Sequence, residues 1–175
     1  MTEPPKEEKA KKPDKVSLEL LATAYHEAGH AVMAIVLGRD VHKVTISPAN
    51  LQTGGTRLGA VRFKKGRTKA TKDWLEDEVL ILLAGMVAES HLTDHYCDMG
   101  ASQDLRDVRR LLESRAKNEK QLEKLERRML DKTEYLLADH GHAKAIELIA
   151  NELIVKETIS GRAVQHFLKM ALQEK

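Results

Sequence analysis

The stretch AYHEAGHAV, residues 24–32, decides how this chain folds. Its two histidines, His26 and His30, are four residues apart, which places them side by side on an α-helix with Cβ atoms about 6 Å apart. Two neutral imidazoles at that spacing can bind one Zn²⁺ ion. Glu27 directly follows the first histidine, so its carboxylate can turn toward the open coordination position and take a proton from water there. The stretch is an H-E-x-x-H motif, and it predicts a hydrolytic zinc site.

The helix that carries this motif is expected to begin after an N-cap at Ser17 and to end near Leu37, with Gly38 just beyond it. Apolar residues at helical spacing form one stripe, and the two histidines fall on roughly the opposite side. The last turns, AVMAIVL, are apolar all round, which is typical of a buried helix. We therefore expect the histidines to face an internal cleft, which disfavours the alternative of a surface helix with solvated histidines.

Outward from this helix, the sequence predicts two strands and then further helices. VHKVTIS, residues 41–47, alternates like a strand, and RLGAVRF, residues 57–63, is a second candidate beyond a turn at Gly54 and Gly55. Residues 91–100 are expected to form a loop, and residues 113–128 an exposed helix or a loop. Further helices are expected after a capping box formed by Asp73 and Glu76, after a cap at Ser102, and over 129–139, 142–156 and 161–172, the last capped by Ser160.

The predicted fold class is mainly α (α+β), with a small β element. A Lys-, Glu- and Pro-rich tail, residues 1–16, is expected to be disordered and charged, and residues 17–175 to form one domain. Hydrophobic residues make up 42% of the 175, but aromatic residues only 3%, so the core must consist of aliphatic side chains, alanine and methionine.

Charge and composition narrow the function classes. The 29 basic and 27 acidic residues give a net charge of +2, which argues against a dedicated nucleic-acid binder. Cys97 is the single cysteine and cannot form an internal disulfide, which favours a reducing compartment. The sequence has neither a secretory signal nor an apolar run long enough for a transmembrane helix, so we expect a cytoplasmic protein.

A catalytic zinc site needs a third protein ligand, because two histidines alone do not hold the ion in this kind of site. Several side chains downstream could supply it, and their chemistry alone does not choose among them. Asp104 has an alternative explanation, since an acidic residue in the first turn of a helix also favours the helix dipole. The candidates are Glu89, His91, Asp94, His95, Cys97, Asp98 and Asp104.

The sequence resembles the peptidase domain of the FtsH-type, membrane-associated, ATP-dependent zinc proteases. The zinc helix in residues 24–32 carries the most specific part of this resemblance, and the order and spacing of the other segments add to it. These segments are VHKVTI (41–46), LGAV (58–61), LLAGMVAES (82–90), GASQDL (100–105) and LIVKETISGRAVQHFL (153–168).

The resemblance implies a role for each matching residue. His26, His30 and Asp104 would be the zinc ligands and Glu27 the catalytic base, while Glu89 would support the site without binding the metal. Residues 58–63 would be the sheet edge along which an extended substrate lies. The implied activity is that of a zinc metalloendopeptidase acting on unfolded or flexible protein chains.

Two departures from the FtsH-type pattern leave alternatives open. The sequence contains no G-x-x-x-x-G-K-[ST] phosphate-binding motif and no transmembrane segment, so ATP-driven unfolding would need a separate ATPase as partner. The rival function is a non-catalytic zinc-binding interaction module of the same fold, because a fold does not guarantee an activity. Assembly as a homo-oligomer is also left open.

Overall fold

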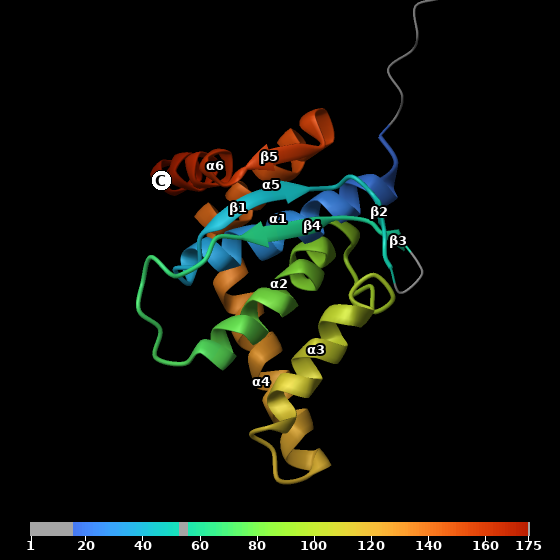
Figure 1. Cartoon of the computed structure of the whole chain (residues 1–175), viewed down its shortest axis with the longest axis vertical. Coiled ribbons are helices and arrows are strands. Elements are labelled where there is room, and N and C mark those ends of the chain that lie inside the picture. The colour runs from blue at the N-terminus through green and yellow to red at the C-terminus, as the bar shows by residue number, and fades with distance from the viewer. Residues whose placement is uncertain (1–15, 53–55, 175) are drawn as a thin grey trace, which may run out of the picture.

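The computed structural model describes residues 16–52 and 56–174, which form helices around a small antiparallel sheet (Figure 1). The helices are α1 (Leu18–Val36), α2 (Trp74–Thr93), α3 (Ser102–Glu113), α4 (Glu119–Leu137), α5 (His140–Lys156) and α6 (Gly161–Gln173). The strands are β1 (Val41–Thr45), β2 (Ala49–Asn50), β3 (Thr56–Arg57), β4 (Ala60–Phe63) and β5 (Thr158–Ser160). The mainly α (α+β) prediction is confirmed. None of the helices among the described residues is long and apolar enough to cross a membrane.

The sheet has the strand order β4-β1-β5, and both pairings are antiparallel. Val44 in the central strand lies opposite Val61 on one side and Ile159 on the other. Strand β4 is therefore an edge strand, and it lies on the side of the sheet next to α2 (Figure 1). The strands β2 and β3 form a separate two-stranded hairpin at one end of the sheet.

Helix α1 lies at the centre of the fold and contacts α2, α5, α6 and the sheet. Its start is fixed by Ser17, whose Oγ accepts a hydrogen bond from the backbone N–H of Leu20 at 3.1 Å. Just beyond its end, Gly38 has a φ of +83°, a conformation that favours glycine. Both predicted ends are thus confirmed, and the buried His26 and His30 confirm that they do not face open solvent.

Two hydrophobic clusters lie against opposite faces of α2. The first cluster combines α1, the sheet, α5 and α6 with the α2 residues Leu80, Ile81, Ala84, Val87 and Ala88. The second combines α3 and α4 with the α2 residues Leu75, Val79, Leu83 and Met86. Helix α2 is thus buried on both sides, and it holds the α3–α4 pair against the rest of the molecule.

Gly29 allows α1 and α2 to approach each other closely. A Cβ atom at this position would lie 2.4 Å from the carbonyl oxygen of Ala84 and 2.5 Å from the Cβ of Ala88. Small residues on both helices, Gly29 on α1 and Ala84 and Ala88 on α2, permit this close approach. The close packing matters for function because it brings the neighbouring turn of α2 against the two histidines.

Replacing Gly29 with alanine is expected to destabilise the protein by about 1–2 kcal/mol. Alanine gains up to about 1 kcal/mol in helix propensity, but overpacking of a tight contact costs about 1–3 kcal/mol, and here backbone would have to move. Urea unfolding of the metal-free variant measures the change. Gly100→Ala is the matched control, since its Cβ would meet no atom closer than 3.6 Å. Equal stability of Gly29→Ala and wild type would contradict the prediction.

The structure corrects several local predictions. Ser102 is the first residue of α3 and not its cap, which is Ala101 without a side-chain hydrogen bond. The predicted loop 91–100 begins three residues late, because α2 continues to Thr93 and ends at Asp94 in the left-handed conformation. The predicted strand 57–63 is interrupted at Leu58 and Gly59.

Further boundaries also differ. The predicted helix 129–139 is the second half of the longer α4, and the charged stretch 113–128 is divided between the two helices and the turn joining them. Only the Asp73 part of the predicted capping box is present: Asp73 caps α2, but the Glu76 carboxylate pairs with Lys132. The predicted turn at Gly54 and Gly55 lies outside the described residues, as does the predicted disordered tail except for Val16.

Candidate metal centre

Three side chains from two helices converge on one point. His26 and His30 project from α1, and Asp104 reaches them from the first turn of α3. The Oδ2 atom of Asp104 lies 3.1 Å from Nε2 of His26 and 3.3 Å from Nε2 of His30. The three candidate ligand atoms all lie within 4.8 Å of one another. This His-His-Asp group can bind a metal ion, and two imidazoles with one carboxylate suit zinc.

The Nδ1 atom of each imidazole makes a hydrogen bond on the side of the ring away from the centre, which leaves Nε2 to face the centre. Nδ1 of His30 lies 2.7 Å from the carbonyl oxygen of Ile81, and because a carbonyl only accepts, Nδ1 must carry the proton. Nδ1 of His26 lies 3.2 Å from Oε2 of Glu89, which accepts in the same way. Histidines that bind metals in proteins nearly always have such a partner, so the residues present fit zinc.

The carboxylates around His26 set its charge in the metal-free protein. Burial lowers the pKa of His26, but hydrogen bonds with Asp104 and Glu89 outweigh it and raise the pKa to about 9. Burial raises the pKa of Asp104, yet the hydrogen bonds from His26 and His30 bring it well below its usual range. A proton therefore occupies the metal-free site near neutral pH and competes with any cation.

Zinc affinity is expected to fall about tenfold for each pH unit below about 9, because one proton must leave His26 when the ion binds. In the metal-free protein, raising the pH has an unfavourable effect instead, because it lowers the stability of the fold. The raised pKa of His26 stabilises the fold fully below the unfolded value of 6.5, and this stabilisation is lost as the pH rises through about 9. Calorimetric zinc titrations in buffers of different ionisation enthalpy count the protons released. Release of no proton, with an affinity independent of pH, would contradict this prediction.

Glu27 lies at the edge of the same centre, where the chain leading into β4 covers it. Its side chain is buried, and a Cβ at Gly59 would lie 2.6 Å from both Cγ and Oε1 of Glu27. Burial raises the pKa of Glu27, which moves the carboxyl group toward the range in which it can accept and return a proton near neutral pH. The small β element is thus close to the candidate site.

Gly85 forms the wall of the centre on the α2 side. A Cβ at this position would lie 2.5 Å from Nε2 of His30 and 2.7 Å from Nε2 of His26. No side chain fits there without displacing the imidazoles from their ligand positions. Nothing in the sequence around Gly85 indicates that this residue lies against the histidines, because the contact is between two separate helices.

The remaining third-ligand candidates lie outside the three-residue group. Glu89 is buried against His26, on the far side of the imidazole from the centre. Asp94 is the C-cap of α2, and the ring of His95 contacts the carbonyl oxygen of Thr93 at 2.8 Å. The three others are exposed or half-buried side chains in the α2–α3 region: His91, Cys97 and Asp98. The sequence gives no signal for the contact of His30 with the carbonyl of Ile81, because every residue has a backbone carbonyl.

These features define a class: a mainly helical domain with two buried histidines and a half-buried aspartate at one centre, a neighbouring glutamate and a sheet edge beside it. The profile of peptidase family M41 matches residues 17–118, which include the whole centre. This match covers more than half of the chain, and the chain belongs to peptidase family M41.

Curated relatives agree with this assignment. The chain is 38% identical over 100 residues to an ATP-dependent zinc metalloprotease FtsH of Protochlamydia amoebophila, covering 55% of this chain and 10% of the relative. It is 42% identical over 88 residues to FtsH 2 of Alkaliphilus metalliredigens, covering 49% and 12%. It is 39% identical over 89 residues to FtsH 1 of Thermomicrobium roseum, covering 50% and 13%. The matched part is thus a small fraction of each relative's length.

Proposed function

We propose that this chain is a zinc metalloendopeptidase domain that hydrolyses peptide bonds in unfolded or flexible protein chains. The observation that carries the proposal is the convergence of His26, His30 and Asp104 beside the buried carboxylate of Glu27. The relatives are zinc metalloproteases by name, which supports the proposal. We assign the three convergent residues as zinc ligands and Glu27 as the general base.

Each residue would have a separate task in hydrolysis. Zinc, when bound by His26, His30 and Asp104, would supply a Lewis acid that activates water and polarises the substrate carbonyl. Glu27 takes the proton from the attacking water and then passes it to the leaving amine, so that the carboxylate is regenerated. Glu89 and the carbonyl of Ile81 keep the imidazoles oriented throughout.

The free edge of β4 supports an extended substrate. An unpaired edge offers backbone N–H and C=O groups to a peptide in strand conformation, and β4 follows directly on the Gly59 segment that covers Glu27. A peptide paired with this edge would pass close to the centre. Only backbone that is free of other structure can add to an edge in this way.

The test compares an unfolded chain with a stably folded protein, each with and without ATP. We expect cleavage of the unfolded chain by zinc-loaded protein without ATP. The folded substrate must first open, which costs up to its whole stability of about 5–15 kcal/mol and suppresses cleavage by several powers of ten. Equal rates on both substrates, or stimulation of the pure protein by ATP, would refute the proposal. Stimulation only after addition of a separate ATPase would identify a partner.

A further inference from the structure

An open pocket of about 760 Å³ lies at the end of β4 that is farther from the metal centre. Its walls come from the connection between α1 and β1, from the end of β4 and the loop after it, from the start of α2, and from the last turn of α3. Two lining residues mark its position, Phe63 on β4 and Leu111 on α3.

Two elements connect this pocket to the metal centre over similar distances. From Gly59, which lies against Glu27, to Phe63 the chain advances four residues, or about 13 Å in an extended strand. From Asp104 to Leu111 helix α3 advances seven residues, or about 10 Å. Strand β4 and helix α3 thus each lead from the centre to the pocket. A substrate paired with β4 would reach the pocket about four residues from the bond that is cut.

The pocket is positively charged. Four cations line it, Arg39, Lys64, Lys65 and Arg67, against the single carboxylate of Glu78. The two arginines are already paired, with Glu78 and with Asp77. The two lysines are exposed, and neither has an ion-pair partner among the described residues. The charge that is free to attract a ligand therefore lies on Lys64 and Lys65.

Aromatic and apolar surface completes the pocket. The guanidinium of Arg39 lies over the ring of Phe63, 4.2 Å from its centroid, which fixes both side chains. Trp74 is 59% exposed although it is a large apolar side chain. The pocket therefore offers an apolar face for the methylene groups of a ligand beside a cationic rim for its charge.

We propose that this pocket is a distal substrate subsite that takes an acidic side chain, Asp or Glu, about four to five residues from the scissile bond. The proposal rests on the proposed peptidase function. Its charge complements a carboxylate, and its position continues the sheet edge on which the substrate lies. Since successive residues of a strand face opposite sides, an acidic pair at the fourth and fifth positions presents one carboxylate to the pocket in either register.

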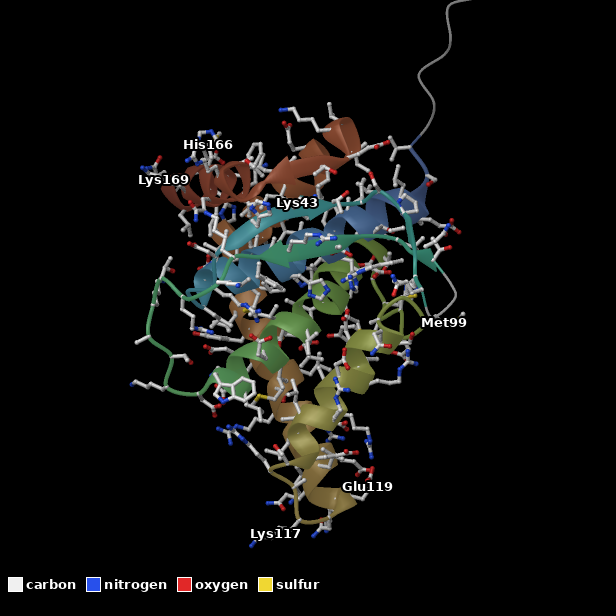
Figure 2. The ribbon with its side chains drawn as sticks, viewed as in Figure 1. Lys43, Met99, Lys117, Glu119, His166 and Lys169 are labelled. Carbon is white, nitrogen blue, oxygen red and sulfur yellow. The ribbon has the colours of Figure 1, made fainter. Side chains whose placement is uncertain are left out.

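The kinetic test uses matched peptides with an acidic pair at these positions on one side of the cleaved bond, on the other side, or on neither. We expect about fivefold higher kcat/KM for one of the acidic peptides, because an exposed ion pair changes a binding constant only a few-fold. The assay is run at low ionic strength, since salt screens such pairs. Lys64→Glu with Lys65→Glu should abolish or invert this preference while still cleaving the neutral peptide. The control pair, Lys117→Glu with Lys169→Glu, makes the same change of net charge at remote exposed sites and should retain the preference (Figure 2).

A binding test is independent of catalysis, because Trp74 is the single tryptophan of the chain and lines the pocket. In the Glu27→Gln variant, which should cleave far more slowly than wild type, the acidic peptide should change the Trp74 fluorescence at about fivefold lower concentration than the neutral one. Equal kcat/KM for all peptides, a preference kept after charge reversal at Lys64 and Lys65, or equal fluorescence titrations would overturn the subsite. Tighter binding of a single-stranded oligonucleotide than of the acidic peptide would also overturn it. Absence of all cleavage with a retained fluorescence preference would refute the peptidase function alone.

Discussion

Replacing Glu27 with glutamine is expected to reduce kcat for an unfolded substrate by about 10²–10⁴-fold while the protein still binds zinc. Glutamine keeps the shape of the side chain against Gly59 but cannot accept a proton, and general acid–base catalysis typically contributes a factor of this size. Because Glu27 is not one of the three convergent residues, the metal content should stay at about one ion per chain.

The measurement combines steady-state kinetics with metal analysis of the same preparations. Glu123→Gln serves as the matched control, since it makes the same chemical change on the exposed surface of α4 and should leave kcat unchanged. Turnover of Glu27→Gln within severalfold of wild type would show that another group is the base. Loss of zinc from this variant would instead mean that the carboxylate helps to hold the ion.

Removing a ligand is expected to have the second large effect. Asp104→Ala and His30→Ala should each weaken zinc binding by more than about 100-fold, because each removes one of the three convergent ligand atoms. Glu89→Ala should weaken it by about 10–100-fold, the usual effect of losing a partner that orients a ligand. The order of the three variants distinguishes ligands from a supporting residue.

Stability measurements give an independent readout of the same substitutions. A free zinc concentration 1,000 times the dissociation constant should stabilise the wild-type protein by about 4 kcal/mol, and most of this gain should be absent in Asp104→Ala. Chemical unfolding with zinc and with a chelator measures the difference. Full zinc affinity in Asp104→Ala together with loss of zinc in Glu89→Ala would show that the third ligand is Glu89.

The central helix and the residues of the candidate centre could be predicted because their signals are local or very specific. The cap at Ser17, the apolar end of α1 and the glycine after it are readable within a few residues. The four-residue spacing of His26 and His30 needs only helical geometry. The choice of Asp104 among seven candidates came from the resemblance, because proximity across 78 residues of chain leaves no periodic signal.

The parts that could not be predicted depend on distant partners. Strand β5 is only three residues long, and it is a strand because β1 lies beside it, more than 110 residues earlier in the chain. The α3 start has no side-chain cap, and Ala101 at that position is instead buried in the second hydrophobic cluster. The tight contact of Gly59 with Glu27 likewise follows from tertiary structure and not from any turn signal.

The position of the metal centre between the two hydrophobic clusters has a consequence for how the protein unfolds. His26 and His30 belong to the helix at the heart of the first cluster, while Asp104 is attached to α3, which packs in the second. A bound ion would therefore cross-link the first cluster and the α3–α4 pair across α2. Neither part could then unfold locally without losing a metal ligand. Chelation should let the α3–α4 half open on its own, visible as faster amide exchange there, whereas zinc should join both halves into one cooperative unit.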